Sequence, residues 1–206
     1  MLSSAPFECP SGLLQHAQQH PPLKTAVVNA ATETVMTSAR LATENGLIEP
    51  ILIGDSSVIN SIAAAIHWDI GTFTMVDAGS ETTAAKLSID LARSGEVLAL
   101  MKGHIQSETL MQEALQRTQG IRLKRRPSHA FYMTVPANEQ GICITDAVIN
   151  VLPRVKQKIA IARNVIELMH ALGNPKPRVA LISGTEASTP EMPSSMDAAE
   201  VVKEAE

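Results

Sequence analysis

The sequence of 206 residues contains few aromatic side chains, so its core must be built from Ala, Val, Ile, Leu and Met. Aromatic residues make up 2% of the chain, although hydrophobic residues as a group make up 45%. So few rings exclude the stacking surfaces that hold single-stranded nucleic acid. Acidic residues outnumber basic ones by 21 to 17, for a net charge of −4. This balance also argues against a nucleic-acid partner held by bulk electrostatic attraction.

Cysteine and long apolar runs are equally scarce. The two cysteines, Cys9 and Cys143, cannot form a disulfide framework, and neither belongs to a C-x-x-C pair. This usage favours a reducing compartment. Residues 1–22 lack the basic start and apolar run of a secretory signal, and no window approaches the roughly 18 apolar residues of a membrane span. We therefore expect a cytoplasmic protein with no membrane-spanning segment.

Several common ligand-binding motifs are absent. The 11 glycines include no G-x-G pair, so the dinucleotide-binding fingerprint is missing, and so are the phosphate loop, H-E-x-x-H and G-x-S-x-G. These absences argue against a P-loop kinase, an α/β-hydrolase and an NAD-dependent dehydrogenase. The six histidines show no metal-ligand spacing beside a carboxylate, so we expect no metal ion.

Short apolar segments alternate with amphipathic ones along the chain. Strands are expected over residues 25–29, 50–54, 72–76, 97–101, 130–135, 142–145 and 178–183. Helices are expected over residues 33–44, 56–65, 80–94, 107–116, 153–172 and 196–206. Strands separated by helices of this length are typical of βαβ units. The pattern predicts an α/β fold with a mainly parallel sheet and flanking helices.

Polar residues follow the expected strands, and ligands bind parallel sheets beyond the carboxyl ends of strands. Lys102 and Gly103 end one strand, and Thr109 lies at the start of the next helix. A cation, a small residue and a hydroxyl beside free helix N–H groups together suit a phosphate or carboxylate. A capped turn with a solvated lysine explains the same pattern.

Two later strands end in a similar way. Thr145, Asp146 and Asn150 follow one of them and either orient a ligand or cap the turn. Ser183 and Glu186 follow the last strand, where the carboxylate is a general base, a positioning group or an exposed turn residue.

Residues 117–126 form a basic segment without any acidic side chain. Its five cationic residues are Arg117, Arg122, Lys124, Arg125 and Arg126. In a chain of net negative charge, such a segment attracts anions such as adenosine phosphates or inorganic phosphate. A solvated loop that aids solubility is the alternative.

Taken together, these segments resemble the phosphate acetyltransferase/phosphate butyryltransferase family, from about Thr25 to Ala205. The most specific pieces are Gly46–Gly54, Leu100–Gly103, Arg125–His129, Ile144–Asn150, Arg178–Ser183 and Pro190–Ala199. The order and spacing of these pieces over most of the chain carry the resemblance. The chain looks closest to the branch related to phosphate butyryltransferase.

The resemblance implies an acyltransferase that converts acyl-CoA and phosphate to acyl phosphate and CoA, with no metal or organic prosthetic group. It implies a fold like that of isocitrate and isopropylmalate dehydrogenases, with two α/β domains and the active site in the cleft between them. The implied partners are acyl-CoA, inorganic phosphate and further copies of the chain. Residues 1–22, rich in Pro, Gln and His, are expected to be a flexible leader with one short helix. On the basis of the resemblance, residues 23–150 are expected to be a first α/β domain and residues 151–206 the start of a second.

The same resemblance places candidate substrate-binding residues. Lys102, Gly103 and Thr109 are expected on the cleft wall. Arg125, Arg126 and Ser128 are expected near the phosphate or CoA. The remaining candidates are Asp146 and Asn150, at the crossing into the second domain, and Ser183 and Glu186 after the last strand.

The family pattern extends further than this sequence. Family members continue through segments that complete the second domain and hold the Ser, Arg and Asp used for CoA binding and proton transfer. The sequence ends at Glu206, so we assign no catalytic residue and expect this form to be inactive or impaired, and poorly soluble or dimeric. The alternative is a non-catalytic protein that binds CoA, phosphate or a partner subunit. A dehydrogenase of the related fold is disfavoured by the missing glycine fingerprint.

Overall fold

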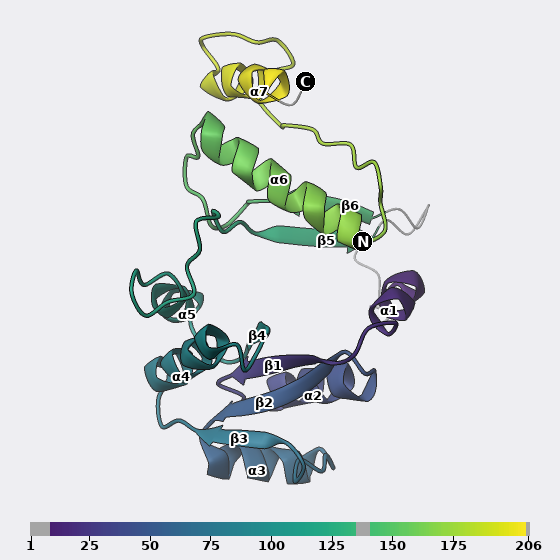
Figure 1. Ribbon diagram of the computed structural model, residues 1–206, viewed down its shortest axis with the longest axis vertical. Helices are drawn as coiled ribbons and strands as arrows, with labels where there is room; N and C mark the ends of the chain where they lie inside the picture. The colour runs from purple at the N-terminus through teal and green to yellow at the C-terminus, as the bar shows by residue number, and fades with distance from the viewer. Residues whose placement is uncertain (1–8, 135–140, 205–206) are drawn as a thin grey trace. The chain divides into compact units, whose positions relative to one another are not determined.

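The computed structural model describes residues 9–134 and 141–204 (Figure 1). The chain divides into two compact units. The first, called here the sheet unit, is Leu14–Arg122, and the second, the hairpin unit, contains described residues 9–13, 123–134 and 141–204. This division falls earlier along the chain than residue 150, where the sequence analysis ends the first domain. Compactness does not test the domain boundaries of the family, so that boundary stays a prediction.

The sheet unit contains a four-stranded parallel sheet with the strand order β3-β2-β1-β4. Its strands are β1 (Leu23–Val28), β2 (Ile48–Gly54), β3 (Thr74–Asp77) and β4 (Ala99–Lys102). Its helices are α2 (Glu33–Glu44), α3 (Ser56–Ala65), α4 (Glu81–Ser94) and α5 (Ser107–Ala114). In the centre of the sheet, Val28 pairs with Ile53 on one side and Lys102 on the other. The α/β fold with a mainly parallel sheet and flanking helices is thus confirmed.

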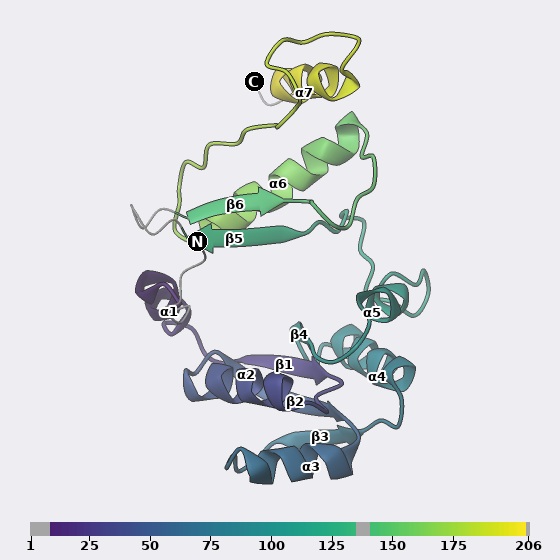
Figure 2. The ribbon, with the colours of Figure 1, turned by 180° about the vertical axis from the view of Figure 1, so that it is seen from behind.

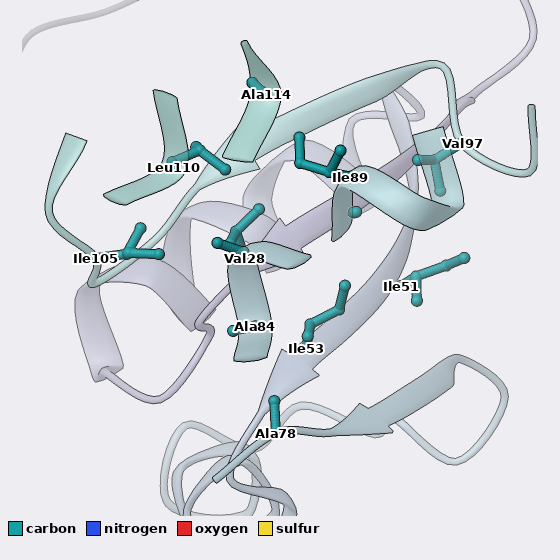
Figure 3. Close-up of a cluster of buried hydrophobic side chains, with 12 residues drawn as sticks. Val28, Ile51, Ile53, Ala78, Ala84, Ile89, Val97, Ile105, Leu110 and Ala114 are labelled. Carbon is teal, nitrogen blue, oxygen red and sulfur yellow. The ribbon is translucent and has the colours of Figure 1, made fainter. Parts of the chain in front are cut away.

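Side chains of β1 and β2 enter two separate cores on opposite faces of the sheet. Val27 and Leu52 pack with side chains of α2 and α3. Val28 and Ile53 pack on the other face with side chains of α4 and α5 (Figure 3). All four side chains are completely buried. Because both faces of the sheet are covered, these strands form continuous apolar runs in the sequence.

Capping interactions explain where the helices of the sheet unit begin and end. Asp55 Oδ1 accepts hydrogen bonds from the N–H groups of Ser57 (2.9 Å) and Val58 (3.1 Å) at the start of α3. Ser80 Oγ accepts one from Thr83 N–H at the start of α4. Gly95 ends α4 with a φ of +80°, the left-handed conformation that glycine adopts most readily. The helix predicted over residues 56–65 thus begins directly after its cap at Asp55.

The hairpin unit is built around a two-stranded antiparallel sheet. Its strands are β5 (Ala130–Thr134) and β6 (Gly141–Thr145), and the predicted extension to Val135 lies outside the described residues. Helix α6 (Val155–Ala171) lies across one face of this hairpin, as Figures 1 and 2 both show. Helix α7 (Pro193–Lys203) packs near α6, where Lys158 Nζ lies 2.8 Å from Asp197 Oδ2.

The other face of the hairpin is apolar and open. Phe131 lies opposite Ile144, and Met133 lies opposite Ile142. The exposed fractions of these four residues lie between 42% for Ile144 and 52% for Ile142. The alternation of strand side chains therefore places one face of the hairpin on α6 and leaves the other uncovered.

The predicted strand over residues 178–183 is wrong. The segment has no regular secondary structure, and Ile182 is 93% exposed. A strand needs a neighbour for its backbone N–H and C=O groups, and within the described part of the hairpin unit β5 and β6 pair only with each other. An apolar run in the sequence indicates a strand only where the fold supplies such a neighbour.

Two helices near the chain ends also differ from expectation in detail. Helix α7 begins at Pro193 rather than Met196, because proline is favoured in the first turn of a helix. Its predicted end at Glu206 lies outside the described residues. Helix α1 (Ser11–Ala17) is the short helix expected within residues 1–22. No helix of the described residues is long and apolar enough to cross a membrane.

Candidate functional site

The order of strands places a topological switch point between β1 and β4. The chain passes from β1 through β2 to β3 at one edge, and then adds β4 on the other side of β1. In doubly wound sheets, ligands bind outside the carboxyl ends of the strands at such a point. Asn29 follows β1 and Lys102 ends β4, so both residues lie there.

Gly103 allows the end of β4 to approach the end of β1. Its N–H donates to the Val28 carbonyl at 2.9 Å, and the N–H of His104 donates to the Asn29 carbonyl at 3.0 Å. A Cβ atom on Gly103 would lie only 2.4 Å from the Val28 oxygen. The predicted ligand contact of Gly103 stays a prediction, but the structure gives this glycine a role in joining the two strands.

Asn29 is a residue of this edge that was not among the candidate site residues predicted from the sequence. Its φ is +55°, and its side-chain Nδ2 donates a hydrogen bond to the His104 carbonyl. Asparagine is one of the few residues besides glycine that adopt this conformation readily. An asparagine directly after a buried strand was the available signal.

Thr109 and Lys102 differ in what surrounds them. Thr109 is half-buried in the first turn of α5, whose preceding residue Gln106 donates its N–H to Glu81 Oε2 at 3.2 Å. A carboxylate thus already lies at this helix N-terminus, where it interacts favourably with the helix dipole. Lys102 is exposed and forms no ion pair among the described residues. It is therefore a cation available to a ligand at the switch point.

Two carboxylates lie at the ends of the neighbouring strands β2 and β3. Asp77 Oδ1 accepts from the Ser56 N–H at 3.0 Å, and Asp55 caps α3. Hydrogen bonds from Ser57 and Val58 lower the pKa of Asp55, and hydrogen bonds from Ser56 lower the pKa of Asp77. Both groups are negative at neutral pH, so this part of the edge suits an anion less well than the β1–β4 part.

In the hairpin unit, the predicted residues Arg125, Arg126 and Ser128 lie in an irregular segment held by one side chain of α6. Arg125 Nε donates to Asn164 Oδ1 at 2.6 Å. Asn164 Nδ2 donates to the Arg126 carbonyl at 2.9 Å and to Ser128 Oγ at 2.8 Å. Arg125 also forms an ion pair with Glu167, with 2.7 Å between Nη2 and Oε2.

Asn164 is the second functional candidate that the sequence analysis missed. It lies in the middle of the predicted amphipathic helix, where asparagine is a weak helix former because its side chain competes for backbone hydrogen bonds. That unfavourable position was a signal of another role. Its partners lie 36 to 39 residues away in the sequence, so nothing local identifies them.

Asp146 and Asn150 contact the same segment from the end of β6. Asp146 has a φ of +47°, and its Oδ1 accepts from the N–H groups of Ile149 (2.9 Å) and Asn150 (3.2 Å). Asn150 Nδ2 donates to Asp146 Oδ2 and, at 3.0 Å, to the Pro127 carbonyl. Asn150 Oδ1 accepts from Arg126 Nη1.

The electrostatics of Asp146 indicate a structural task. Burial raises the pKa of Asp146. Hydrogen bonds, among them those from the Asn150 side chain and from the N–H groups of Ile149 and Asn150, together lower this pKa by more than burial raises it, so the net shift is downward. A carboxylate with a lowered pKa is ionised at neutral pH and is a weak base. Asp146 caps the turn and orients Asn150, while its predicted contact with substrate stays a prediction.

The structure thus brings five of the ten predicted residues into one network of hydrogen bonds in the hairpin unit. These five are Arg125, Arg126, Ser128, Asp146 and Asn150. Ser183 is not part of it in the described residues, since its Oγ pairs with Ser194 Oγ at 2.8 Å. Glu186 is exposed.

The other basic residues of the segment and the possible metal ligands show no comparable arrangement. Arg117, Arg122 and Lys124 are exposed and form no ion pair among the described residues. The described residues also contain no group of three or more His, Cys, Asp or Glu side chains placed to hold a metal ion. The expectation of no metal stays a prediction.

Curated proteins similar to this chain are named phosphate acetyltransferase or phosphate butyryltransferase. It is 38% identical over 194 residues to a phosphate acetyltransferase of Rhizobium meliloti, a match that covers 94% of this chain and 61% of the relative. It is 33% identical over 180 residues to a phosphate butyryltransferase of Clostridium acetobutylicum, covering 87% of this chain and 60% of the relative. The chain therefore spans about three fifths of the length of these relatives.

Solved structures of phosphotransacylases share the fold. A branched-chain phosphotransacylase from Enterococcus faecalis matches 88% of this chain and 64% of its own with a TM-score of 0.70 and 26% identity. A phosphotransacetylase from Streptococcus pyogenes matches 94% of this chain and 68% of its own with a TM-score of 0.71; at 16% identity it shows the fold alone. Residues 81–206 match the family model described as phosphate acetyl/butaryl transferase. The chain, which includes the Arg125–Ser128 segment and its partners on α6, belongs to this family.

Proposed function

We propose that this chain carries part of the substrate-binding machinery of an acyltransferase that moves an acyl group between CoA and inorganic phosphate. Family membership and relatives named phosphate acetyltransferase and phosphate butyryltransferase support this proposal. Because the chain spans 61% of the first of these relatives, the activity of the chain itself belongs to the proposal.

The chemistry of the proposed reaction explains which side chains it needs. A phosphate oxygen attacks the thioester carbonyl, an oxyanion forms, and the C–S bond then breaks to release the CoA thiolate, which takes up a proton. Phosphate and CoA are both anionic, so the protein must hold two anions together and stabilise a third negative centre. The CoA thioester is a substrate that the reaction consumes, and the proposal includes no prosthetic group.

The observation that carries the proposal is the Arg125–Ser128 segment, which Asn164 of α6 holds by hydrogen bonds in the hairpin unit. Arg126 and Ser128 are assigned to a substrate phosphate group there, with Asn150 and Asn164 holding the segment. In the sheet unit, Lys102 is the exposed cation at the switch point and is assigned to substrate binding on that ground.

Three further properties belong to the same proposal. A fold related to isocitrate and isopropylmalate dehydrogenases, with two α/β domains, is supported by the parallel sheet with its switch point. A cytoplasmic location without a nucleic-acid partner is supported by two free cysteines and a net charge of −4. Association between copies is supported by the open apolar face of the hairpin.

The test of the proposed function is release of the CoA thiol from acetyl-CoA and butyryl-CoA in the presence of phosphate or arsenate. The chain is assayed beside a form lengthened by whatever coding sequence follows Glu206, and beside the Rhizobium meliloti relative as a positive control. The expected result is that at least one of the two forms of the chain releases thiol, and that this release requires both the acyl-CoA and the added phosphate or arsenate. Turnover by the 206-residue chain alone would show that it holds the catalytic groups.

A non-catalytic protein that binds CoA, phosphate or a partner is the second candidate. The observation that favours it is the described site itself, in which Arg126 and Ser128 can bind an anion while the lowered pKa of Asp146 makes this carboxylate a weak base. If neither form of the chain releases thiol, but CoA or phosphate binds saturably, the binding function would be accepted in place of the acyltransferase function.

A further inference from the structure

The two adjacent arginines of the Arg125–Ser128 segment have different electrostatic surroundings. Arg125 is paired with the Glu167 carboxylate, and its Nε is also bound by Asn164. Arg126 forms no ion pair among the described residues, and its Nη1 donates to the neutral amide oxygen of Asn150. The charge of Arg125 is therefore largely offset within the protein, whereas that of Arg126 is available to an anion.

The segment has no regular backbone structure, so side-chain hydrogen bonds set its conformation. Asn164 supplies three of them with one amide group. Its two Nδ2 hydrogens go to the Arg126 carbonyl and to Ser128 Oγ, and its Oδ1 accepts from Arg125. Only one orientation of the amide satisfies all three partners, since the opposite one would place Oδ1 against the Arg126 carbonyl oxygen.

The bond from Asn164 also determines what Ser128 can do. Ser128 Oγ accepts from Asn164 Nδ2, so its hydroxyl hydrogen remains able to donate to another group. The Ser128 hydroxyl lies two residues from Arg126, which has no carboxylate partner among the described residues. A hydroxyl donor and a guanidinium group together suit a tetrahedral oxyanion such as phosphate, which has several acceptor oxygens.

We propose that Asn164 is a positioning residue, which holds Arg125 and Ser128 to α6 and thereby orients Arg126 as the cation that binds a phosphate group of the substrates. This inference rests on the proposed function and divides the roles of the two arginines. The phosphate group belongs either to inorganic phosphate or to CoA, and the chemistry of recognition is the same for both.

The experiment measures the affinity of the full chain for inorganic phosphate and for CoA, in separate titrations at low ionic strength. Arg126→Ala and Asn164→Ala are each expected to weaken binding of at least one of the two ligands by about tenfold or more, since a charge-assisted hydrogen bond is lost or misplaced. The ligand that responds identifies the source of the phosphate group. Arg125→Ala is expected to act through position alone and to weaken the same ligand less than Arg126→Ala.

Asn60→Ala is the matched control for Asn164→Ala. Asn60 is an exposed residue of α3, and its Nδ2 donates only to the Ser56 carbonyl of the same helix, at 2.8 Å. The control removes the same side chain from a helix without touching the Arg125–Ser128 segment. Its ligand affinities are expected to equal those of the unmodified chain.

A double variant separates positioning from a general structural effect. If Asn164 acts through Arg126, then Asn164→Ala has little further effect on affinity once Arg126 is already Ala. Independent losses that add in the double variant would overturn the proposal. In whichever form turns over in the thiol assay, Asn164→Ala is expected to raise the KM of the responding substrate more than it lowers kcat.

Other outcomes bear on the inference and on the proposed function separately. Acyl transfer with unchanged affinity and KM in Asn164→Ala would overturn the inference and leave the function intact. Phosphate binding that needs both residues, without any acyl transfer, would support the inference and overturn the function. If the unmodified chain binds neither inorganic phosphate nor CoA, the inference is overturned. Should Asn164→Ala lose its thermal unfolding transition, Asn164→Ser, which keeps one hydroxyl partner, takes its place in the same titrations.

Discussion

The sheet unit and the hairpin unit differ in how completely they cover their strands. In the sheet unit, both faces of the parallel sheet pack against helices, and Val27, Val28, Leu52 and Ile53 have no exposed surface. Among the described residues, all buried hydrophobic side chains lie in the sheet unit except Ile161, Val165 and Val201. The hairpin unit thus holds its shape with a smaller core and with polar contacts such as those of Asn164 and Asn150.

The comparison shows what each unit uses to specify its conformation. A sheet between two helix layers is specified by burial, which is non-directional and scales with apolar area. A hairpin covered by one helix leaves an irregular segment whose position depends on directional hydrogen bonds. Substitutions in the core should therefore destabilise the sheet unit most, and substitutions of polar residues should act mainly on ligand binding in the hairpin unit.

The largest effect is expected for Leu52→Ala in the core of the sheet unit. Removal of this completely buried side chain leaves a cavity and should lower the free energy of unfolding by about 3 kcal/mol. Ile142→Ala on the open face of the hairpin should lower it by less than about 1 kcal/mol. Urea unfolding followed by circular dichroism checks both, and equal losses would erase the contrast between the units.

Gly103→Ala should destabilise the sheet unit by about 2 kcal/mol. The added Cβ would lie 2.4 Å from the Val28 oxygen and 2.5 Å from the Asn29 oxygen, so β4 would have to move away from β1. Gly12→Ala is the control, because a Cβ there meets nothing within 4 Å and α1 should become slightly more stable. Thermal unfolding of both variants tests this, and an unchanged melting temperature for Gly103→Ala would contradict the close approach.

Ser80→Ala should lower the free energy of unfolding by about 1 kcal/mol, because Ser80 Oγ accepts the Thr83 N–H at the start of α4. Thr32→Ala at the start of α2 is the control, since the Thr32 side chain makes no capping hydrogen bond. A similar loss from both substitutions would mean that the side-chain hydrogen bond is not the cause.

The stability of both units should fall in acid, for the same physical reason. The folded-state pKa values of Asp55 and Asp77 in the sheet unit, and of Asp146 in the hairpin unit, lie below their ordinary values. Their contribution is therefore present above the unfolded pKa of about 3.9 and is lost as the pH falls through the lower folded pKa. Asp55→Asn keeps a side-chain oxygen that can cap α3 but removes the ionisable carboxyl group.

The measurement is the melting temperature of the chain and of Asp55→Asn between about pH 5 and pH 2, a range that spans the unfolded carboxyl pKa. The variant is expected to lose less stability over this range. A parallel decline of the two proteins would show that Asp55 contributes nothing to the acid dependence.

The smallest change in stability is expected for Phe131→Thr combined with Ile142→Thr. Both residues are about half exposed on the open face of the hairpin, so the free energy of unfolding should change by no more than about 0.5 kcal/mol. The same substitutions should reduce association between copies, measured by sedimentation at several concentrations. Ile182→Thr, at a 93% exposed position outside the hairpin, should leave association unchanged.

The helices and strands of the sheet unit could be predicted from the sequence because their signals are local. Continuous apolar runs identified β1 and β2, and amphipathic segments identified α3 and α4. The same reasoning failed for residues 178–183, because an apolar run records the tendency of a segment to be buried but not whether a neighbouring strand is present.

The candidate site could be predicted only in its composition. The basic segment was visible in the sequence, yet the different surroundings of Arg125 and Arg126 were not, since their partners Glu167 and Asn150 lie on other elements. Resemblance to known sequences placed the chain in its family, but the role of Asn164 follows only from contacts that the fold makes.

The sequence by itself determined the fold class and the alternation of strands and helices, because propensities, caps and apolar runs act within a few residues of each other. Resemblance to known sequences, rather than these local signals, indicated the family. Only the tertiary structure decided that Gly103 joins two strand ends, that Asn164 holds a segment 36 to 39 residues away, and that Arg126 rather than Arg125 keeps its charge available. These outcomes depend on which residues meet after folding, and hydrogen bonds and ion pairs form only at distances that packing sets.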